Sequence, residues 1–144
     1  VAVSPAAREG LKLFTGKARC GECHTVGEWW ALFSDGLAHN TGVGYHQRFE
    51  YLGYGGDGLD GNVATRNAFH GEYMTPGLRN VARTAPYMHD GSLGSLEEVI
   101  DFYDRGGVAN PHRDPRLKPL GLTPGEKAQL VELLKSLTGE VPAP

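Results

Sequence analysis

Apolar side chains recur near both ends of the chain at intervals that place them on one face of a helix. These faces consist of Ala7, Leu11 and Phe14 near the N-terminus and of Leu130, Val131, Leu133, Leu134 and Leu137 near the C-terminus. The first pattern follows a Ser-Pro start and ends at Gly16, and the last follows a capping box at Thr123 and ends at Gly139. A second capping box at Ser95 predicts a third helix, which reaches about Tyr103. The pattern therefore predicts a mostly α fold.

The segments between these helices are rich in residues that interrupt regular structure. Residues 35–73 hold nine of the 21 glycines, and residues 109–119 hold three of the nine prolines, so we expect long loops there. We expect the glycine-rich stretch to wrap a cofactor and to contain little regular structure. Only 40% of the 144 residues are hydrophobic, which predicts a single domain, residues 1–144, with a thin core. Something besides side chains, such as a metal, a disulfide or a cofactor, would then fill that core.

Charge and hydropathy exclude two classes of partner. The formal net charge is -3, and no basic stripe of the kind that binds nucleic acid is present. No run of about 18 apolar residues exists, so we expect no membrane span. The chain begins at Val1 without a methionine, which fits either a mature protein whose signal peptide has been removed or a trimmed chain.

The two cysteines lie in one window, Cys20-Gly-Glu-Cys23-His24, which is the C-x-x-C-H pattern of covalent c-type haem attachment. The two thiols can add to the vinyl groups of one haem, and the imidazole that follows can bind the iron. A thioredoxin-like redox pair is less well supported because no strand pattern precedes Cys20. A zinc site needs more soft ligands, and a disulfide here would close little chain. We therefore expect one covalently bound haem c, which would also fill the thin core.

A c-type haem combined with helices at both ends predicts a class I cytochrome c-like haem domain with long glycine-rich loops. Covalent haem attachment takes place outside the cytoplasm, so we expect a periplasmic, exported protein. His24 supplies one axial ligand to the iron. The pattern leaves the second ligand open among Met74, Met88, Tyr103, His39, His46, His70, His89 and His112.

Several long segments resemble the bacterial di-haem cytochrome c peroxidase and MauG family. They are residues 16–24, residues 39–43, residues 75–92 (TPGLRNVARTAPYMHDGS), residues 96–107 (LEEVIDFYDRGG) and the stretch from residue 120 into the last helix. The resemblance covers most of the chain outside about residues 44–72. It implies that this chain corresponds to the C-terminal half of the family, which holds the electron-transfer haem.

The resemblance also implies roles for individual residues. The family's second axial ligand lies fourteen residues after the histidine that matches His89, which places it at Tyr103. The alternative for Tyr103 is a half-buried aromatic residue that packs on the haem edge. Arg79 is a candidate partner for a haem propionate, with a surface ion pair as the alternative. His89 is expected in a hydrogen-bonded turn that shapes the haem pocket.

A calcium ion is a further cofactor that the family suggests. The backbone carbonyls of Thr84 and Pro86 match positions that help hold calcium between the two halves of the peroxidases. The remaining ligands come from the other half, so these carbonyls alone make a poor calcium site. A single glycine-rich segment, residues 55–62, also resembles a calcium-binding repeat, but one copy is better explained as a solvated loop.

The family's chains carry two C-x-x-C-H motifs, and this sequence carries one. The resemblance therefore favours a mono-haem electron-transfer protein or subunit. Its partner would be a redox protein that donates or accepts electrons, or a second haem-bearing subunit. The alternative is a peroxidase-type enzyme, either one subunit of a split di-haem peroxidase or a haem whose second ligand can be displaced.

Overall fold

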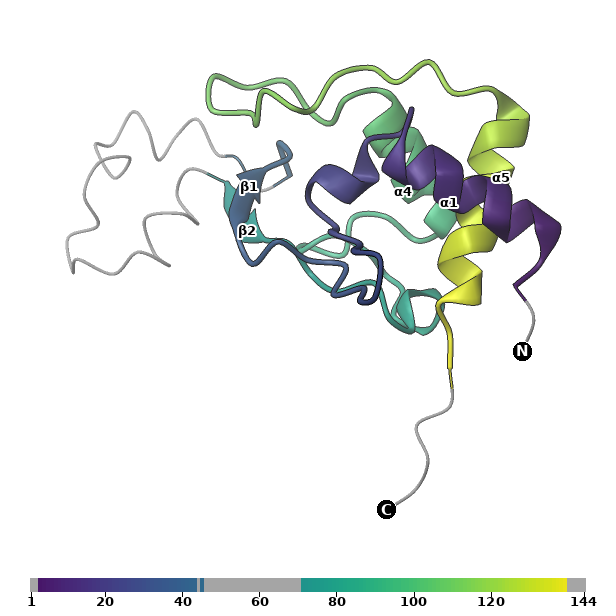
Figure 1. Cartoon of the computed structure of the whole chain (residues 1–144). Helices are drawn as coiled ribbons and strands as arrows, with labels where there is room; N and C mark the ends of the chain where they lie inside the picture. The colour runs from purple at the N-terminus through teal and green to yellow at the C-terminus, as the bar shows by residue number, and fades with distance from the viewer. Residues whose placement is uncertain (1–2, 44, 46–70, 140–144) are drawn as a thin grey trace.

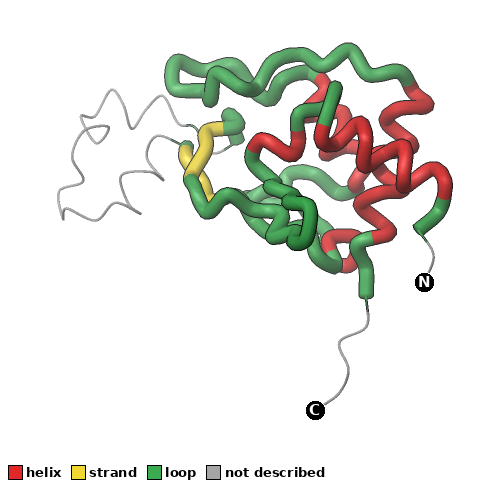
Figure 2. The backbone as a smooth tube through the Cα atoms, viewed as in Figure 1, coloured by secondary structure: helices red, strands yellow, loops and turns green. Residues whose placement is uncertain are grey.

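The computed structural model describes residues 3–43, 45 and 71–139 (Figure 1). Its elements in chain order are helix α1 (Pro5–Thr15), the short 3-10 helix η1 (Cys20–Glu22), strands β1 (Ala38–Asn40) and β2 (Glu72–Met74), the short 3-10 helix η2 (Val81–Arg83), and helices α4 (Leu96–Asp104) and α5 (Pro124–Ser136). Loops connect these elements over most of the remaining described chain (Figure 2). None of the helices in these ranges has the length and apolar character that crossing a bilayer requires.

The three predicted α-helices are present, and their start signals act as expected. The backbone N–H of Ala7 donates to the Ser4 hydroxyl oxygen at 3.1 Å, which caps α1. Ser95 and Thr123 each form both hydrogen bonds of a capping box with the glutamate three residues later. The prediction of a mostly α chain is therefore confirmed for the described residues, whereas the class I cytochrome c arrangement stays a prediction.

The expectation of little regular structure across residues 35–73 is wrong in one respect. Strands β1 and β2 pair in antiparallel register, with Ala38 opposite Met74 and Asn40 opposite Glu72. Each strand is three residues long, so the backbone ladder is too short to impose a visible alternation on the sequence. His46, His70 and most of the glycine-rich stretch lie outside the described residues.

Helices α1 and α5 cross in close contact, as Figure 1 shows. Gly10 makes this approach possible, because a β-carbon at that position would collide with the carbonyl oxygen of Gln129 on α5. Phe14 of α1 and Leu130 and Leu133 of α5 are almost completely buried beside the crossing. The first and last helices therefore enclose the core together with α4, which contributes buried residues to the same cluster.

We expect Gly10→Ala to lower the free energy of unfolding by about 1–3 kcal/mol, because the added methyl group must push two helix backbones apart. Urea denaturation followed by circular dichroism measures the change. Gly125→Ala is the matched control, since a β-carbon at this helical glycine meets nothing closer than 4.0 Å. The control is expected to be neutral or slightly stabilising. Equal loss of stability in both variants would contradict the close crossing at Gly10.

Candidate haem-binding site

The predicted haem-attachment segment forms one tight turn. Arg19 has a φ of 55°, in the left-handed region, and leads into η1. The backbone N–H groups of Cys23 and His24 both donate to the carbonyl oxygen of Cys20, at 3.3 and 2.8 Å. Both thiols are free and half-buried. Two accessible thiols and an imidazole on one turn form the donor set that covalent haem attachment requires.

A backbone carbonyl orients the ring of His24. Its Nδ1 atom lies 2.8 Å from the carbonyl oxygen of Phe33. A carbonyl oxygen can only accept a hydrogen bond, so in the neutral ring this contact favours the tautomer with the proton on Nδ1 and the lone pair on Nε2, the atom that a metal would use. Burial lowers the pKa of His24, which favours the neutral, metal-binding form of the ring. The ring of Phe14 packs 6.4 Å from His24 and 6.2 Å from Phe33, so the core holds both partners in place.

Tyr103 lies half-buried at the end of α4, and the adjacent ring of Phe102 meets it edge-on at 5.2 Å. Burial is the main cause that raises the pKa of Tyr103 to about 12, and the electrostatic influence of Cys20 and Cys23 acts in the same direction. This influence places the phenol near both thiols, although about eighty residues separate them along the chain. The fold therefore brings Tyr103 to the turn that also carries His24.

The other described candidates for the second ligand have different surroundings. Met74 lies on β2 with 63% of its surface exposed, and Met88 has a φ of 68° in the turn after Pro86. The exposed ring of His89 stacks on the ring of Tyr73, with centroids 3.6 Å apart and planes inclined by 14°. The electrostatic influence of both cysteines on Tyr103 favours this residue as the second ligand.

His39 belongs to a charged cluster that the sequence did not predict. Its Nε2 atom lies 2.8 Å from a carboxylate oxygen of Asp35, and its Nδ1 atom lies 2.9 Å from Asp114. Arg116 binds Asp114 through two nitrogens and approaches the His39 ring at 2.6 Å. The side chains of His39, Asp35 and Asp114 are only 11–12% exposed. With both ring nitrogens engaged, His39 is an unfavourable iron ligand.

This cluster ties two distant segments of the chain to the turn that carries Cys23. Burial opposes ionisation of Asp35, but hydrogen bonds from the Leu37 N–H and His39 outweigh it and lower the pKa of Asp35 to about 2. Hydrogen bonds from Arg116 hold the pKa of Asp114 well below its usual range. The Cys23 sulfur, a carboxylate oxygen of Asp35 and a ring nitrogen of His39 all lie within 4.8 Å of one another. The 75-residue separation of His39 and Asp114 explains why no local pattern revealed the cluster.

Arg79 and the turn after it were predicted to border the haem. Arg79 donates to the carbonyl oxygen of Ala31, in the loop after the attachment turn, at 3.1 Å. The Tyr87 N–H donates to the Leu93 carbonyl at 2.6 Å, so the segment that holds Pro86 and His89 is a hydrogen-bonded turn. Propionate and calcium binding here stay predictions.

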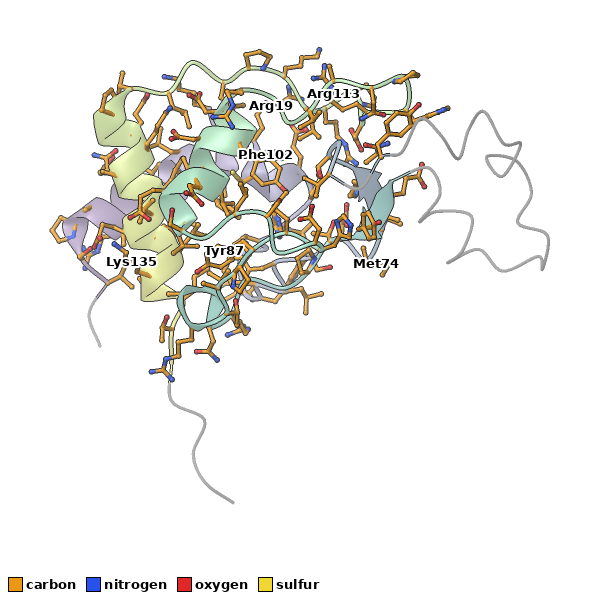
Figure 3. All side chains as sticks on the ribbon, turned by 180° about the vertical axis from the view of Figure 1, so that it is seen from behind. Arg19, Met74, Tyr87, Phe102, Arg113 and Lys135 are labelled. Atoms are coloured by element: carbon orange, nitrogen blue, oxygen red, sulfur yellow. The ribbon has the colours of Figure 1, made fainter. Side chains whose placement is uncertain are left out.

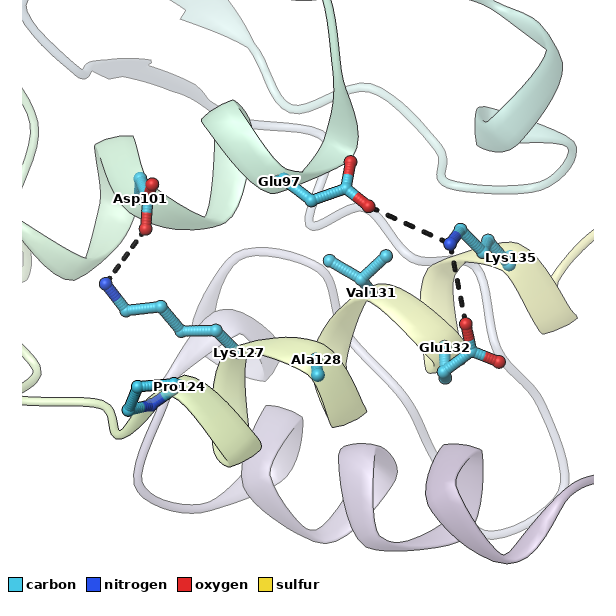
Figure 4. Close-up of a pocket in the computed structure, with 8 residues that line it drawn as sticks. All are labelled: Glu97, Asp101, Pro124, Lys127, Ala128, Val131, Glu132 and Lys135. Carbon is cyan, nitrogen blue, oxygen red and sulfur yellow. Dashed lines mark hydrogen bonds and ion pairs between the residues drawn. The ribbon is translucent and has the colours of Figure 1, made fainter.

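A groove of about 350 Å³ lies between α4 and α5, away from the predicted haem ligands (Figure 4). Two ion pairs bridge the groove. The Lys127 nitrogen lies 2.9 Å from a carboxylate oxygen of Asp101, and the Lys135 nitrogen lies 3.8 Å from one of Glu97. None of the residues predicted to bind haem lines the groove. Its charged walls suit neither the apolar face of a haem nor a covalent link to the chain.

The chain is similar to several known proteins. No protein-family model matches it. The methylamine utilization protein MauG of Methylorubrum extorquens is 38% identical over 139 residues, which cover 96% of this chain and 36% of that protein. The cytochrome-c peroxidase IdrP2 of Denitromonas iodatirespirans is 36% identical over 155 residues, which cover 92% of this chain and 40% of that protein.

A solved structure supports the same relationship. The crystal structure of a MauG-like protein associated with microbial copper homeostasis matches with a TM-score of 0.68 and 32% identity, over 96% of this chain and 48% of that one. The chain thus spans less than half the length of these relatives. Over most of its own length, this chain is homologous to members of the bacterial di-haem cytochrome c peroxidase and MauG family, as its sequence motifs indicate.

Proposed function

We propose that this chain is an electron-transfer haem domain that corresponds to the C-terminal half of its di-haem relatives. Cys20 and Cys23 would hold one haem c through thioether bonds, and His24 and Tyr103 would bind its iron. The observation that carries the proposal is the electrostatic influence of Cys20 and Cys23 on Tyr103, together with the shared core against which both Cys20 and helix α4 pack. The bound haem supplies one-electron redox chemistry.

The residues of the chain determine which redox chemistry the site supports. The Phe33 carbonyl fixes the ring of His24 and keeps its Nε2 lone pair available. An anionic phenolate oxygen from Tyr103 favours the ferric state, so the reduction potential is expected to be low. If His24 and Tyr103 both bind the iron, they would leave no vacant position for peroxide. Such a saturated site moves electrons more readily than it activates an oxidant.

The names of the relatives favour a second candidate function. IdrP2 is described as a cytochrome-c peroxidase, so a peroxidase-type role, in a split enzyme or through displacement of Tyr103, is the alternative. A redox protein or a second haem-bearing subunit is the proposed partner in either case. We propose a periplasmic location, because c-type haems are attached outside the cytoplasm.

The optical spectrum of the ferric protein separates the two candidates. An electron-transfer domain is expected to give a six-coordinate low-spin spectrum that neither cyanide nor peroxide changes, because both axial positions are filled. A high-spin band that shifts when either compound is added would instead support the enzyme. A spectrum without haem bands, from a host that matures c-type cytochromes, would contradict both.

A further inference from the structure

The loop after α4 concentrates positive charge in a chain whose net charge is -3. Between residues 105 and 119 it carries a single carboxylate, Asp114, and the cationic residues Arg105, Arg113, Arg116 and Lys118. In Figure 1 this green loop runs along the upper edge of the molecule between α4 and α5. The net charge of the whole chain therefore conceals a local positive excess.

The fold gathers three of these cations around Gly106. This glycine has a φ of 82°, and a β-carbon on it would lie 2.9 Å from the carbonyl carbon of Lys118, so the two backbones are in contact. The Arg113 guanidinium donates to the Gly106 carbonyl at 3.1 Å, and Arg105 is the preceding residue. Arg105 and Lys118 are exposed, and neither has a carboxylate partner within the described residues. The backbone positions of Arg105 and Lys118 and the guanidinium of Arg113 thus lie together at the C-terminal end of α4.

This positive surface borders the proposed haem site on two sides. Tyr103 lies two residues before Arg105 on the same helix end. Arg116 donates to the Glu22 carbonyl in the attachment turn at 3.5 Å, and Arg19 forms an ion pair with Glu22 at 2.8 Å. Figure 3 shows Arg19 and Arg113 toward the upper edge of the molecule, above Phe102. A partner bound at this edge would be close to the haem.

Helix stabilisation accounts for part of the arrangement. Cations near a helix C-terminus interact favourably with its exposed carbonyls, and Arg113 does so directly at Gly106. Within the described part of the chain, the side chains of Arg105 and Lys118 form no hydrogen bond to the helix, and both residues are exposed to solvent. Their unneutralised charges are therefore available to a second molecule.

We propose that Arg105, Arg113 and Lys118 form the docking surface for a redox protein with an acidic surface. The inference rests on the proposed electron-transfer function and specifies the partner's charge and its place of contact. Opposite charge at this edge steers the partner into orientations that bring its redox centre near the haem. In each encounter one electron passes from the reduced partner to the ferric haem, which becomes ferrous, or the reverse.

The test uses the haem-loaded protein and oxidised plant-type ferredoxin as an acidic protein probe. The double variant Arg105→Gln/Lys118→Gln removes two charges and keeps the hydrogen bond from Arg113 to the Gly106 carbonyl. Arg8→Gln/Arg83→Gln is the matched control, because it removes two exposed cations from α1 and η2. Calorimetric titration at low salt measures binding without any electron transfer. The first variant is expected to bind about tenfold more weakly, and the control is expected to bind as the parent does.

The outcomes separate this inference from the function on which it rests. Equal weakening in both variants, or binding that does not weaken as salt rises, would overturn the docking surface. So would stronger attachment to phosphatidylglycerol vesicles than to ferredoxin. If the haem is reduced and reoxidised normally but ferredoxin does not bind, the docking inference alone fails. If binding shows the expected charge dependence but the haem cannot be cycled, the electron-transfer function fails instead.

Discussion

Replacement of both Cys20 and Cys23 by alanine is expected to abolish covalent haem attachment. The two thiols are the only cysteines in the chain, and both lie on the turn that also presents His24. Without them no side chain can form a thioether bond to the haem vinyl groups. Haem that the variant takes up should therefore be lost completely under denaturing conditions, whereas the parent protein should keep its haem. Peroxidase staining of denaturing gels together with intact-mass measurement records the difference.

The single variants Cys20→Ala and Cys23→Ala provide the control. Each keeps one thiol on the same turn, so each is expected to retain a single covalent link in a smaller share of the molecules. Haem that stays bound to the double variant after denaturation would show attachment through another residue. A parent protein that carries zinc and no haem would instead support the metal site that the cysteine pair alone did not exclude.

The change Tyr103→Phe is expected to convert the ferric haem from a six-coordinate low-spin form to a high-spin form. Phenylalanine fills nearly the same half-buried volume at the end of α4 but has no oxygen to bind iron. Cyanide affinity should rise by about tenfold or more, because the sixth position no longer has to be vacated. The reduction potential should also rise, since an anionic oxygen no longer favours the ferric state. Optical titration and spectroelectrochemistry measure these changes.

Tyr87→Phe is the matched control for this experiment. Its hydroxyl donates to the Val81 carbonyl at 3.0 Å, so the variant loses one hydrogen bond and is expected to keep the ferric spectrum of the parent. Met88→Leu supplies the competing test. If that variant changes the spectrum while Tyr103→Phe does not, Met88 is the second ligand and the assignment of Tyr103 is wrong.

The parts of the fold that the sequence predicts correctly depend on local chemistry. The capping boxes at Ser95 and Thr123 and the Ser-Pro start of α1 involve residues three or four positions apart, so a single stretch of sequence contains the whole signal. The haem-attachment turn is local in the same sense, since Cys20, Cys23 and His24 share one turn. Such elements can be predicted from the sequence without any knowledge of the tertiary structure.

The parts that were missed depend on distant pairing. Strand β1 meets β2 across more than thirty residues, and neither three-residue strand carries an alternating pattern. Asp114 and Arg116, which meet His39 of β1, lie in a loop whose prolines indicated only the absence of regular structure. The positive surface around Gly106 was hidden for the same reason, because Arg105 and Lys118 become neighbours only when the loop folds back. Tyr103 was found through family resemblance and not through spacing.

The crossing of α1 and α5 has a consequence for the order of events during biogenesis. The ribosome makes α1 first, yet α5, the helix that crosses it at Gly10, follows more than one hundred residues later. The core that Phe14 shares with α5 therefore closes only after α5 has been made, and until then the Cys20–His24 turn lies beside an incomplete core. We expect haem-attaching enzymes to act in this interval on an open chain, and α5 to close the domain afterwards.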